Sequence, residues 1–215
     1  MKLDTSKILV LAPHTDDEIH CMGSVIEMLD RGADVHVHAF SSCEDSIPEG
    51  LKRGAIKAEF MKAMEALSIP PKNFSVGSFP VRRFDERRQS ILNVMIGLRG
   101  QISPTLVFCP SSTDCHQDHR VVHEEAIRAF RNCSALLGWE APHNQRVATT
   151  NVHLSISQNS LDGKIEHWRN YKSQGFRGYF NEDFLRALAI VRGAQMRNLK
   201  TGLAEAFEML AVNVR

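Results

Sequence analysis

The feature that most constrains the fold is a short apolar run near the amino terminus that ends in a cluster of ionisable side chains. Residues 8–11 are apolar at every position, which is typical of a strand buried on both faces, and such strands occur in parallel sheets. Pro13 ends this strand, and the ionisable residues that follow are His14, Asp16, Asp17 and Glu18. Because ligands bind at the carboxyl ends of strands in open α/β sheets, the sequence predicts a reactive loop here.

The rest of the chain repeats an alternation of strands and helices. Helical spacing covers residues 19–30, 51–67, 86–102 and 120–131. Strands are expected over residues 34–41, 74–79 and 105–110. In the last third, we expect one or two strands within residues 146–157 and helices over residues 161–171, 184–196 and 203–210. The pattern predicts a single α/β domain with a mainly parallel sheet between helical layers.

Composition excludes several classes of protein. The net charge is +1 and the basic residues are dispersed, so the chain lacks the basic stripe of a nucleic-acid-binding protein. No run approaches the roughly 20 apolar residues of a membrane span, and the amino terminus lacks the apolar segment of a signal peptide. The 5 cysteines are scattered without a Cys-x-x-Cys pair, which is typical of a reducing compartment. We therefore expect a cytoplasmic protein with neither a nucleic-acid partner nor a membrane span.

A second loop carries the same residue types as the first. The apolar strand at 105–110 ends at Pro110, and His116, Asp118 and His119 follow it. Parallel strands bring their carboxyl ends to one rim, so we expect the two loops to lie together. Imidazole and carboxylate in a set of three ligands are typical of a catalytic zinc site, which keeps a fourth position for water, although non-haem iron uses the same ligand types. The residues alone do not rank Asp16 against Asp17.

Both loops carry a family resemblance. Residues 12–18, Ala-Pro-His-Thr-Asp-Asp-Glu, are similar to the Ala-His-Pro-Asp-Asp-Glu signature of the LmbE-like, or PIG-L, family of zinc-dependent N-acetylglucosaminyl deacetylases. Residues 116–119, His-Gln-Asp-His, resemble the second signature of that family, His-x-Asp-His. Further segments resemble bacterial members from sugar-modification pathways: 140–144, 171–174, 192–193 and 205–208. The resemblance implies one LmbE-like deacetylase domain over residues 1–215, with a Rossmann-like three-layer α/β/α fold.

The resemblance also implies a role for each ionisable residue. His14, Asp17 and His119 would hold one zinc ion per chain, and Asp16 would be the general base that activates the zinc-bound water. A cationic His116 would stabilise the oxyanion. Asp118 would orient His116 and keep it charged.

Other assignments are expectations of the same kind. Residues expected to contact substrate are Arg53, Glu140, Asn144 and Arg192. Some relatives place a tyrosine near the oxyanion, for which this chain offers Tyr171 and Tyr179. We expect Glu18 to be a helix-start acid and Asp118 to cap the helix that follows it. Cys115 is a less favoured candidate for a zinc ligand.

Together these features predict a zinc-dependent hydrolase that removes the N-acetyl group from a small-molecule N-acetylated amino sugar or sugar conjugate. One alternative is a related zinc amidase that acts on a different acyl or amide group. A second alternative, which is not an enzyme, is a sugar or nucleotide-sugar binding protein. A metal-dependent phosphodiesterase would need a second metal and more carboxylates than the two loops supply. The identity of the sugar and the formation of a homo-oligomer are left open.

Overall fold

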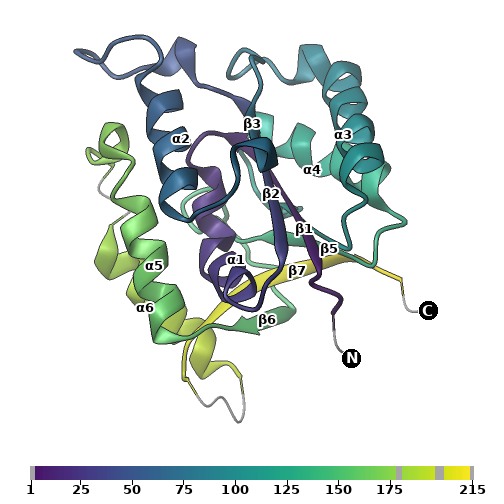
Figure 1. Ribbon diagram of the computed structural model, residues 1–215, viewed down its shortest axis with the longest axis vertical. Helices are drawn as coiled ribbons and strands as arrows, with labels where there is room; N and C mark the ends of the chain where they lie inside the picture. Colours follow the sequence, from purple (N-terminus) through teal and green to yellow (C-terminus); the bar gives the residue numbers. More distant parts are fainter. Residues whose placement is uncertain (1–2, 178–180, 197–200, 214–215) are drawn as a thin grey trace.

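The computed structural model describes residues 3–177, 181–196 and 201–213, and in them seven strands form one sheet in the order β3-β2-β1-β4-β5-β7-β6 (Figure 1). The strands are β1 (Lys7–His14), β2 (Asp34–Ser41), β3 (Phe74–Val76), β4 (Leu106–Pro110), β5 (Ala135–Trp139), β6 (Val152–Ser155) and β7 (Ala204–Val212). The α-helices are α1 (Met22–Leu29), α2 (Ala55–Ala66), α3 (Arg88–Ile102), α4 (Gln117–Phe130), α5 (Gln158–Trp168) and α6 (Glu182–Ala194). Short 3-10 helices are η1 (Asp17–Cys21), η2 (Glu44–Ser46), η3 (Pro71–Asn73), η4 (Asp85–Arg87) and η5 (Lys172–Gln174).

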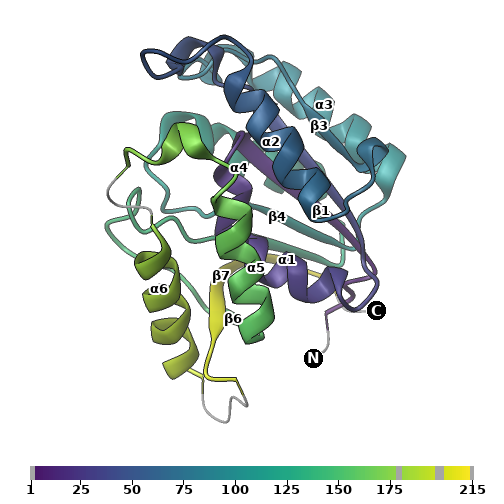
Figure 2. The ribbon, with the colours of Figure 1, turned by 60° about the vertical axis from the view of Figure 1, so that its left-hand side comes forward.

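Strand β1 shows why the sheet is buried on both faces. Successive side chains of a strand point to opposite faces, and all of Ile8–Leu11 is inaccessible to solvent. Ile8 and Val10 belong to a core completed by α1, α2, α5 and α6, whereas Leu9 and Leu11 belong to a core completed by α3 and α4. The two helical layers lie on opposite sides of the sheet (Figures 1 and 2). The predicted three-layer α/β/α domain is confirmed.

The topology brings two distant loops together. Strands β3, β2, β1, β4 and β5 are parallel, while β7 pairs antiparallel with both β5 and β6. The chain leaves β1 toward β2 on one side, yet β4 pairs with β1 on the other side, with Val10 opposite Phe108. This is the point at which the strand order reverses, where open α/β sheets bind ligands. The loops after β1 and β4 therefore meet at one rim, as the sequence predicts.

Two elements of the last third differ from the sequence prediction. Residues 203–210, expected to be a helix, lie instead within β7, which occupies a position between two other strands. Its apolar residues recur at both strand and helix spacing, and pairing on both edges decides in favour of the strand. The sequence made no prediction for β5, and only β6 forms within residues 146–157. The remaining predicted elements are present, with ends shifted by up to four residues.

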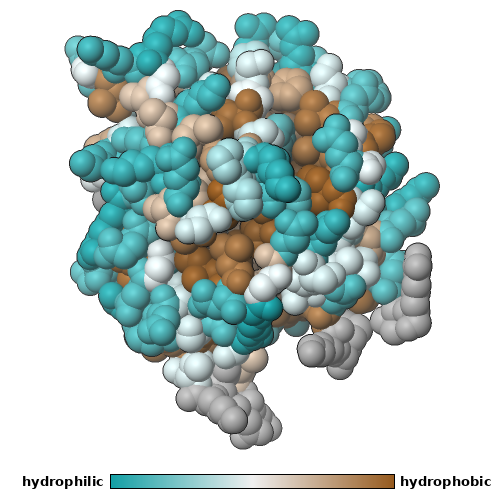
Figure 3. Space-filling view, in the orientation of Figure 1, coloured by the Kyte–Doolittle hydropathy of each residue, from teal (hydrophilic) through white to brown (hydrophobic). Residues whose placement is uncertain are grey.

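The surface carries apolar side chains on several elements. In Figure 3, apolar side chains gather toward the middle of one face and hydrophilic side chains surround them. Large apolar residues exposed in the described part of the chain are Leu51, Ile96, Ile127, Val147, Phe176, Ile190, Val191 and Val212. None of the helices in the described ranges is both long and apolar enough to cross a membrane.

Candidate functional site

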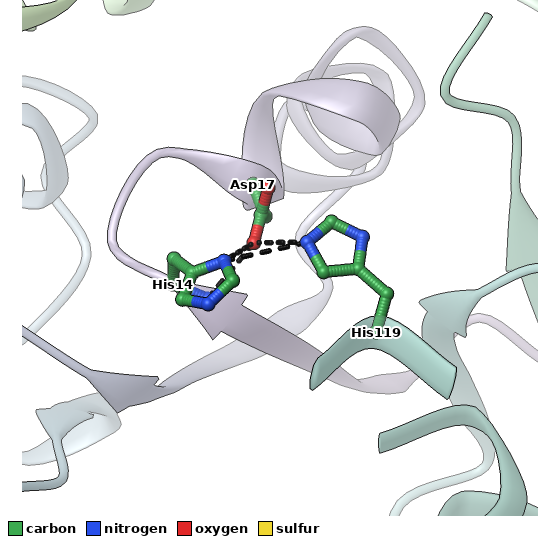
Figure 4. A group of neighbouring side chains, drawn as sticks. All are labelled: His14, Asp17 and His119. Atoms are coloured by element: carbon green, nitrogen blue, oxygen red, sulfur yellow. Dashed lines mark hydrogen bonds and ion pairs between the residues drawn. The ribbon is translucent and has the colours of Figure 1, made fainter. Parts of the chain in front are cut away.

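Three side chains from three elements converge at the rim between β1 and β4. His14 is the last residue of β1, Asp17 begins η1, and His119 lies in the first turn of α4 (Figure 4). All three are at least nine-tenths buried. The backbone N–H of His14 donates to Asp17 Oδ2 at 2.9 Å, which holds the turn after β1 closed. The fold therefore unites the three residues expected to bind metal.

The donor atoms of these three side chains form a compact triangle. Asp17 Oδ2 lies 3.0 Å from His14 Nδ1 and 3.1 Å from His119 Nε2, and the two ring nitrogens are 3.3 Å apart. Four ligands bonded to zinc at 2.0–2.1 Å in a tetrahedron lie about 3.3–3.4 Å from one another. The triangle is close to one face of such a tetrahedron, so the residues fit a small divalent ion.

A buried carboxylate supports each histidine from behind. His14 Nε2, the nitrogen outside the triangle, lies 2.9 Å from Asp118 Oδ2, and His119 Nδ1 lies 2.7 Å from Asp114 Oδ2. Both carboxylates are almost inaccessible to solvent. Such a carboxylate fixes the tautomer and orientation of a metal-binding imidazole. Sequence reasoning missed Asp114, although it lies five residues before His119, because its role depends on the turn that precedes α4.

The electrostatics of the triangle favour a cation. Burial raises the pKa of Asp17, but the charges and hydrogen bonds of His119 and His14 outweigh it and hold that pKa well below its usual range. Burial lowers the pKa of His119, yet Asp17 and Asp114 raise it by more, so the net pKa is well above the ordinary value. Binding of a metal ion requires neutral imidazoles, so an entering ion would release protons from this site.

Asp16 adjoins the triangle and lines the cavity that lies above it. Its φ is 125°, a region that residues other than glycine rarely adopt. Burial and the neighbouring Asp17 charge raise the pKa of Asp16 well above its usual range. A carboxyl group with a raised pKa beside a candidate metal centre is suited to accept and return protons.

His116 and Asp118 are arranged differently from the expectation. The Asp118 carboxylate contacts His14 and accepts from the backbone N–H groups of Arg82 and Phe84. What reaches His116 is the Asp118 backbone N–H, which donates to His116 Nδ1 at 3.2 Å. His116 itself is therefore the N-cap of α4, the role expected of Asp118.

The protonation of His116 also differs from the expectation. Burial, followed by the nearby His119 and His14, lowers the pKa of His116 to about 4, so the protein holds this ring neutral rather than cationic. With Nδ1 accepting a hydrogen bond, the proton of the neutral ring lies on Nε2.

A cavity of about 160 Å³ opens above these residues. Asn144 and its neighbour His143 line it, together with residues that the sequence did not single out as substrate contacts: His20, Trp168, Gln174 and Arg177. The rings of His20 and His143 stack with centroids 5.5 Å apart. Gln174 is buried, and among the described residues its Oε1 has no hydrogen-bond partner. Gln174 therefore carries an acceptor, unpaired within the described ranges, in the wall of the cavity.

Three residues expected to contact substrate lie away from this cavity. Arg53 is exposed, with its Nε 3.6 Å from a carboxylate oxygen of Glu44. Glu140 and Arg192 pair with each other at 2.7 Å beneath the surface. A buried pair of this kind satisfies both charges internally. Of the four residues expected to contact substrate, the fold brings only Asn144 to the cavity.

Other sequence expectations are resolved as follows. Glu18 lies in the first turn of η1, as expected of a helix-start acid, and it is fully buried. Tyr171 donates a hydrogen bond to it instead of lining the cavity. Tyr179 lies outside the described residues. Cys115 is exposed and does not belong to the metal-ligand groups found in the described ranges.

Comparisons with known proteins agree with this geometry. Residues 9–130 match the family described as PIG-L, GlcNAc-PI de-N-acetylase. A search of curated proteins finds no match.

Several solved structures are similar over almost the whole chain. One is the N,N'-diacetylchitobiose deacetylase from Pyrococcus horikoshii complexed with its inhibitor MPG (19% identity, 96% of this chain and 84% of that chain, TM-score 0.73). Another is the zinc-inhibited form of teicoplanin deacetylase Orf2 (16%, 94% and 97%, TM-score 0.77). A third is GalB, the 4-carboxy-2-hydroxymuconate hydratase from Pseudomonas putida KT2440 (17%, 98% and 98%, TM-score 0.76). At these identities the likeness shows the fold.

Proposed function

We propose that this chain, which belongs to the PIG-L family, removes the N-acetyl group from an N-acetylated amino sugar or sugar conjugate with the help of a zinc ion. As a member of that family it is a deacetylase, a hydrolase that acts on amide bonds. The fold alone does not select the reaction, because one of the similar structures is a hydratase. The proposal adds the class of substrate, the metal and the roles of the residues.

The observation that carries the proposal is the donor triangle at the floor of the cavity. His14, Asp17 and His119 offer two imidazole nitrogens and one carboxylate oxygen at the separations a tetrahedral ion requires. A carboxylate behind each histidine orients these donors. We assign the three residues to a zinc ion, which would supply Lewis acidity that polarises the acetamide carbonyl and activates a water molecule at neutral pH.

The chain's own groups provide the proton transfers. Asp16 accepts the proton of the attacking water and later gives it to the leaving amine, a dual role that its raised pKa favours. His116, neutral and protonated on Nε2, donates a hydrogen bond to the oxygen of the tetrahedral intermediate. Asp118 holds His14 rather than His116, so it is a positioning residue in this scheme.

The lining of the cavity suits a sugar. Its wall combines the Trp168 ring with polar groups such as Asn144 and Gln174, directly beside the donor triangle. Two similar structures are named as deacetylases, one of diacetylchitobiose and one of teicoplanin. These features favour an N-acetylated sugar over a simple amide, and they leave the particular sugar to experiment.

The test is to measure acetate release from a panel of substrates. The purified protein, loaded with one equivalent of zinc, is incubated with N-acetylated sugars that are free or nucleotide-linked, and with N-formyl and N-propionyl analogues. We expect acetate and a free amine from at least one N-acetyl sugar, with turnover lost on chelation and restored by zinc. Faster cleavage of the analogues would favour the amidase alternative, and saturable binding without turnover would favour a binding protein. Restoration by ferrous iron but not by zinc would overturn the metal assignment.

A further inference from the structure

Glu18 is a buried carboxylate that the proposed reaction does not use. It has no solvent exposure, and three donors converge on its two oxygens. Oε1 accepts from the Tyr171 hydroxyl and from His167 Nε2, the latter at 2.8 Å. Oε2 accepts from the backbone N–H of Asp16 at 3.1 Å. The carboxylate thus joins the loop after β1 to the segment around the end of α5.

The Asp16 backbone needs such support. A φ of 125° is unfavourable for an aspartate, and conformations of this kind persist only where the surroundings fix them. The direction of a backbone N–H follows the rotation of the adjoining peptide, so a bond to that N–H restrains the backbone at Asp16. Glu18 supplies the side-chain acceptor for this group.

The partners of Glu18 also lie next to the cavity wall. Tyr171 is positioned between Trp168 and Gln174, both of which line the cavity, while His167 precedes Trp168 on α5. Tyr171 and His167 are buried and their rings pack edge to face, with centroids 5.6 Å apart. The same segment therefore shapes the wall and anchors the acceptor that holds Asp16.

We propose that Glu18, held by Tyr171 and His167, is a positioning residue that keeps Asp16 in its left-handed backbone conformation and so aims the Asp16 carboxylate at the reacting atoms. This inference rests on the proposed function, because it assigns Asp16 as the general base. Glu18 itself does not touch the substrate.

The first experiment compares Glu18→Gln and Tyr171→Phe with wild type. A glutamine keeps one acceptor oxygen, but its amide group must face either the Asp16 N–H or the two donors on the other side. We expect kcat to fall roughly 10- to 100-fold for Glu18→Gln, since a misplacement of about 1 Å can cost that much. We expect KM and zinc content to stay within about twofold, and Tyr171→Phe to show the same pattern to a smaller degree. Tyr171→Phe removes one hydroxyl, which keeps the proposal testable if Glu18→Gln fails to fold.

A matched control separates this role from simple anchoring. Glu27 on α1 also ties the first helical segment to α5, by accepting from the Ser157 N–H at 2.9 Å and from the Ser160 hydroxyl at 2.7 Å, but it has no bond to Asp16. We expect Glu27→Gln to lower the melting temperature at most and to leave kcat unchanged. A fall in kcat equal to that of Glu18→Gln would overturn the proposal.

A double-mutant cycle tests whether Glu18 acts through Asp16. In an Asp16→Asn background, Glu18→Gln should have almost no further effect on kcat, because residues that act as a unit are not additive. Additive losses would mean that Glu18 supports the protein in some other way, and would overturn the proposal.

Crystallography provides a test that does not depend on turnover. Crystal structures of wild type and Glu18→Gln should show Asp16 leaving its positive φ and its carboxylate turning from the cavity in the variant. An unchanged Asp16 would overturn the proposal whatever the kinetics. If wild type released no acetate from any substrate, the proposed function would fail, and this crystallographic comparison alone would decide the positioning role.

Discussion

The region of the chain from β1 to α4 and the region that follows it make different contributions to the site. The region from β1 to α4, which the family match covers almost completely, carries the donor triangle, the proposed base Asp16 and His116. The region that follows adds the part of the cavity wall that includes Trp168, Gln174 and Arg177. We therefore expect catalysis to depend mainly on the first region and substrate selection to depend more on the second. Substitutions in the first should change metal binding and kcat, whereas those in the second should change KM.

Loss of the metal should have the largest effect. His119→Ala removes one of three donors, and we expect zinc binding to weaken beyond detection in the purified protein and turnover to fall by about 10³-fold or more, since the metal supplies several kcal/mol. Metal analysis and acetate release measure the two effects. Cys115→Ala is the control, because this exposed residue lies outside the donor triangle. Loss of zinc from the control would contradict the ligand assignment.

Asp16→Asn should separate catalysis from metal binding. We expect kcat to fall by about 10²- to 10⁴-fold while zinc stoichiometry stays at one, because a general base is removed and the three donors remain. Near-normal turnover in this variant would show that another group performs the proton transfer.

Removal of a carboxylate that orients one of the two histidines should have an intermediate effect. We expect Asp114→Asn to weaken zinc affinity by about 10- to 100-fold, because the amide holds the His119 ring less firmly. Competition with a chelator of known affinity measures this change. The matched control is Glu140→Gln, which alters a buried carboxylate of the other region, and its zinc affinity should equal that of wild type. Equal weakening in both variants would refute the assigned support.

A substitution in the cavity wall should alter substrate binding alone. Gln174→Ala removes an acceptor that is buried and without a partner in the described part of the chain. We expect KM to rise by about 2- to 10-fold, the usual worth of one hydrogen bond, with kcat unchanged. A fall in kcat without a change in KM would contradict the expectation that this region acts on substrate binding.

The smallest effect should be on the free energy of unfolding at acid pH, through Glu27, which joins α1 to the start of α5. Burial raises the pKa of Glu27, but hydrogen bonds from Ser160 and Ser157 outweigh it and lower that pKa to about 2. Because the folded pKa is below the unfolded value of about 4.3, the unfolded state binds the proton first and stability is lost as pH falls between these values. Glu27→Gln should weaken this dependence by the order of 1 kcal/mol in urea unfolding at pH 3 against pH 6. If the free energy of unfolding depended on pH equally in variant and wild type, Glu27 would not be the source of this acid sensitivity.

The sequence predicted the first region better than the second for physical reasons. His14, Asp17 and His119 follow apolar strands whose pairing is simple to infer, so their meeting at one rim could be predicted. Asp114 could not be assigned, since its role depends on a turn whose dihedral angles are not encoded in a periodic pattern.

In the second region, contacts between distant segments decide the outcome. The sequence gives no sign that Glu18 and Tyr171 meet. Strand β7 was mistaken for a helix because nine residues of mixed spacing obtain their structure from the strands on either side. One residue of the first region was also predicted wrongly: Arg53 was expected to contact substrate, but its exposed position on the loop before α2 places it away from the cavity.

The position of β7 between β5 and β6 also dictates an order of assembly. Strand β6 pairs only with β7 among the described strands, although β7 follows it by some fifty positions. During synthesis on a ribosome, β6 must therefore wait, unpaired, until β7 has been made and released from the exit tunnel. The parallel strands can form while translation continues, so nascent chains should form the rim that carries the donor triangle before β6 and β7 complete the sheet.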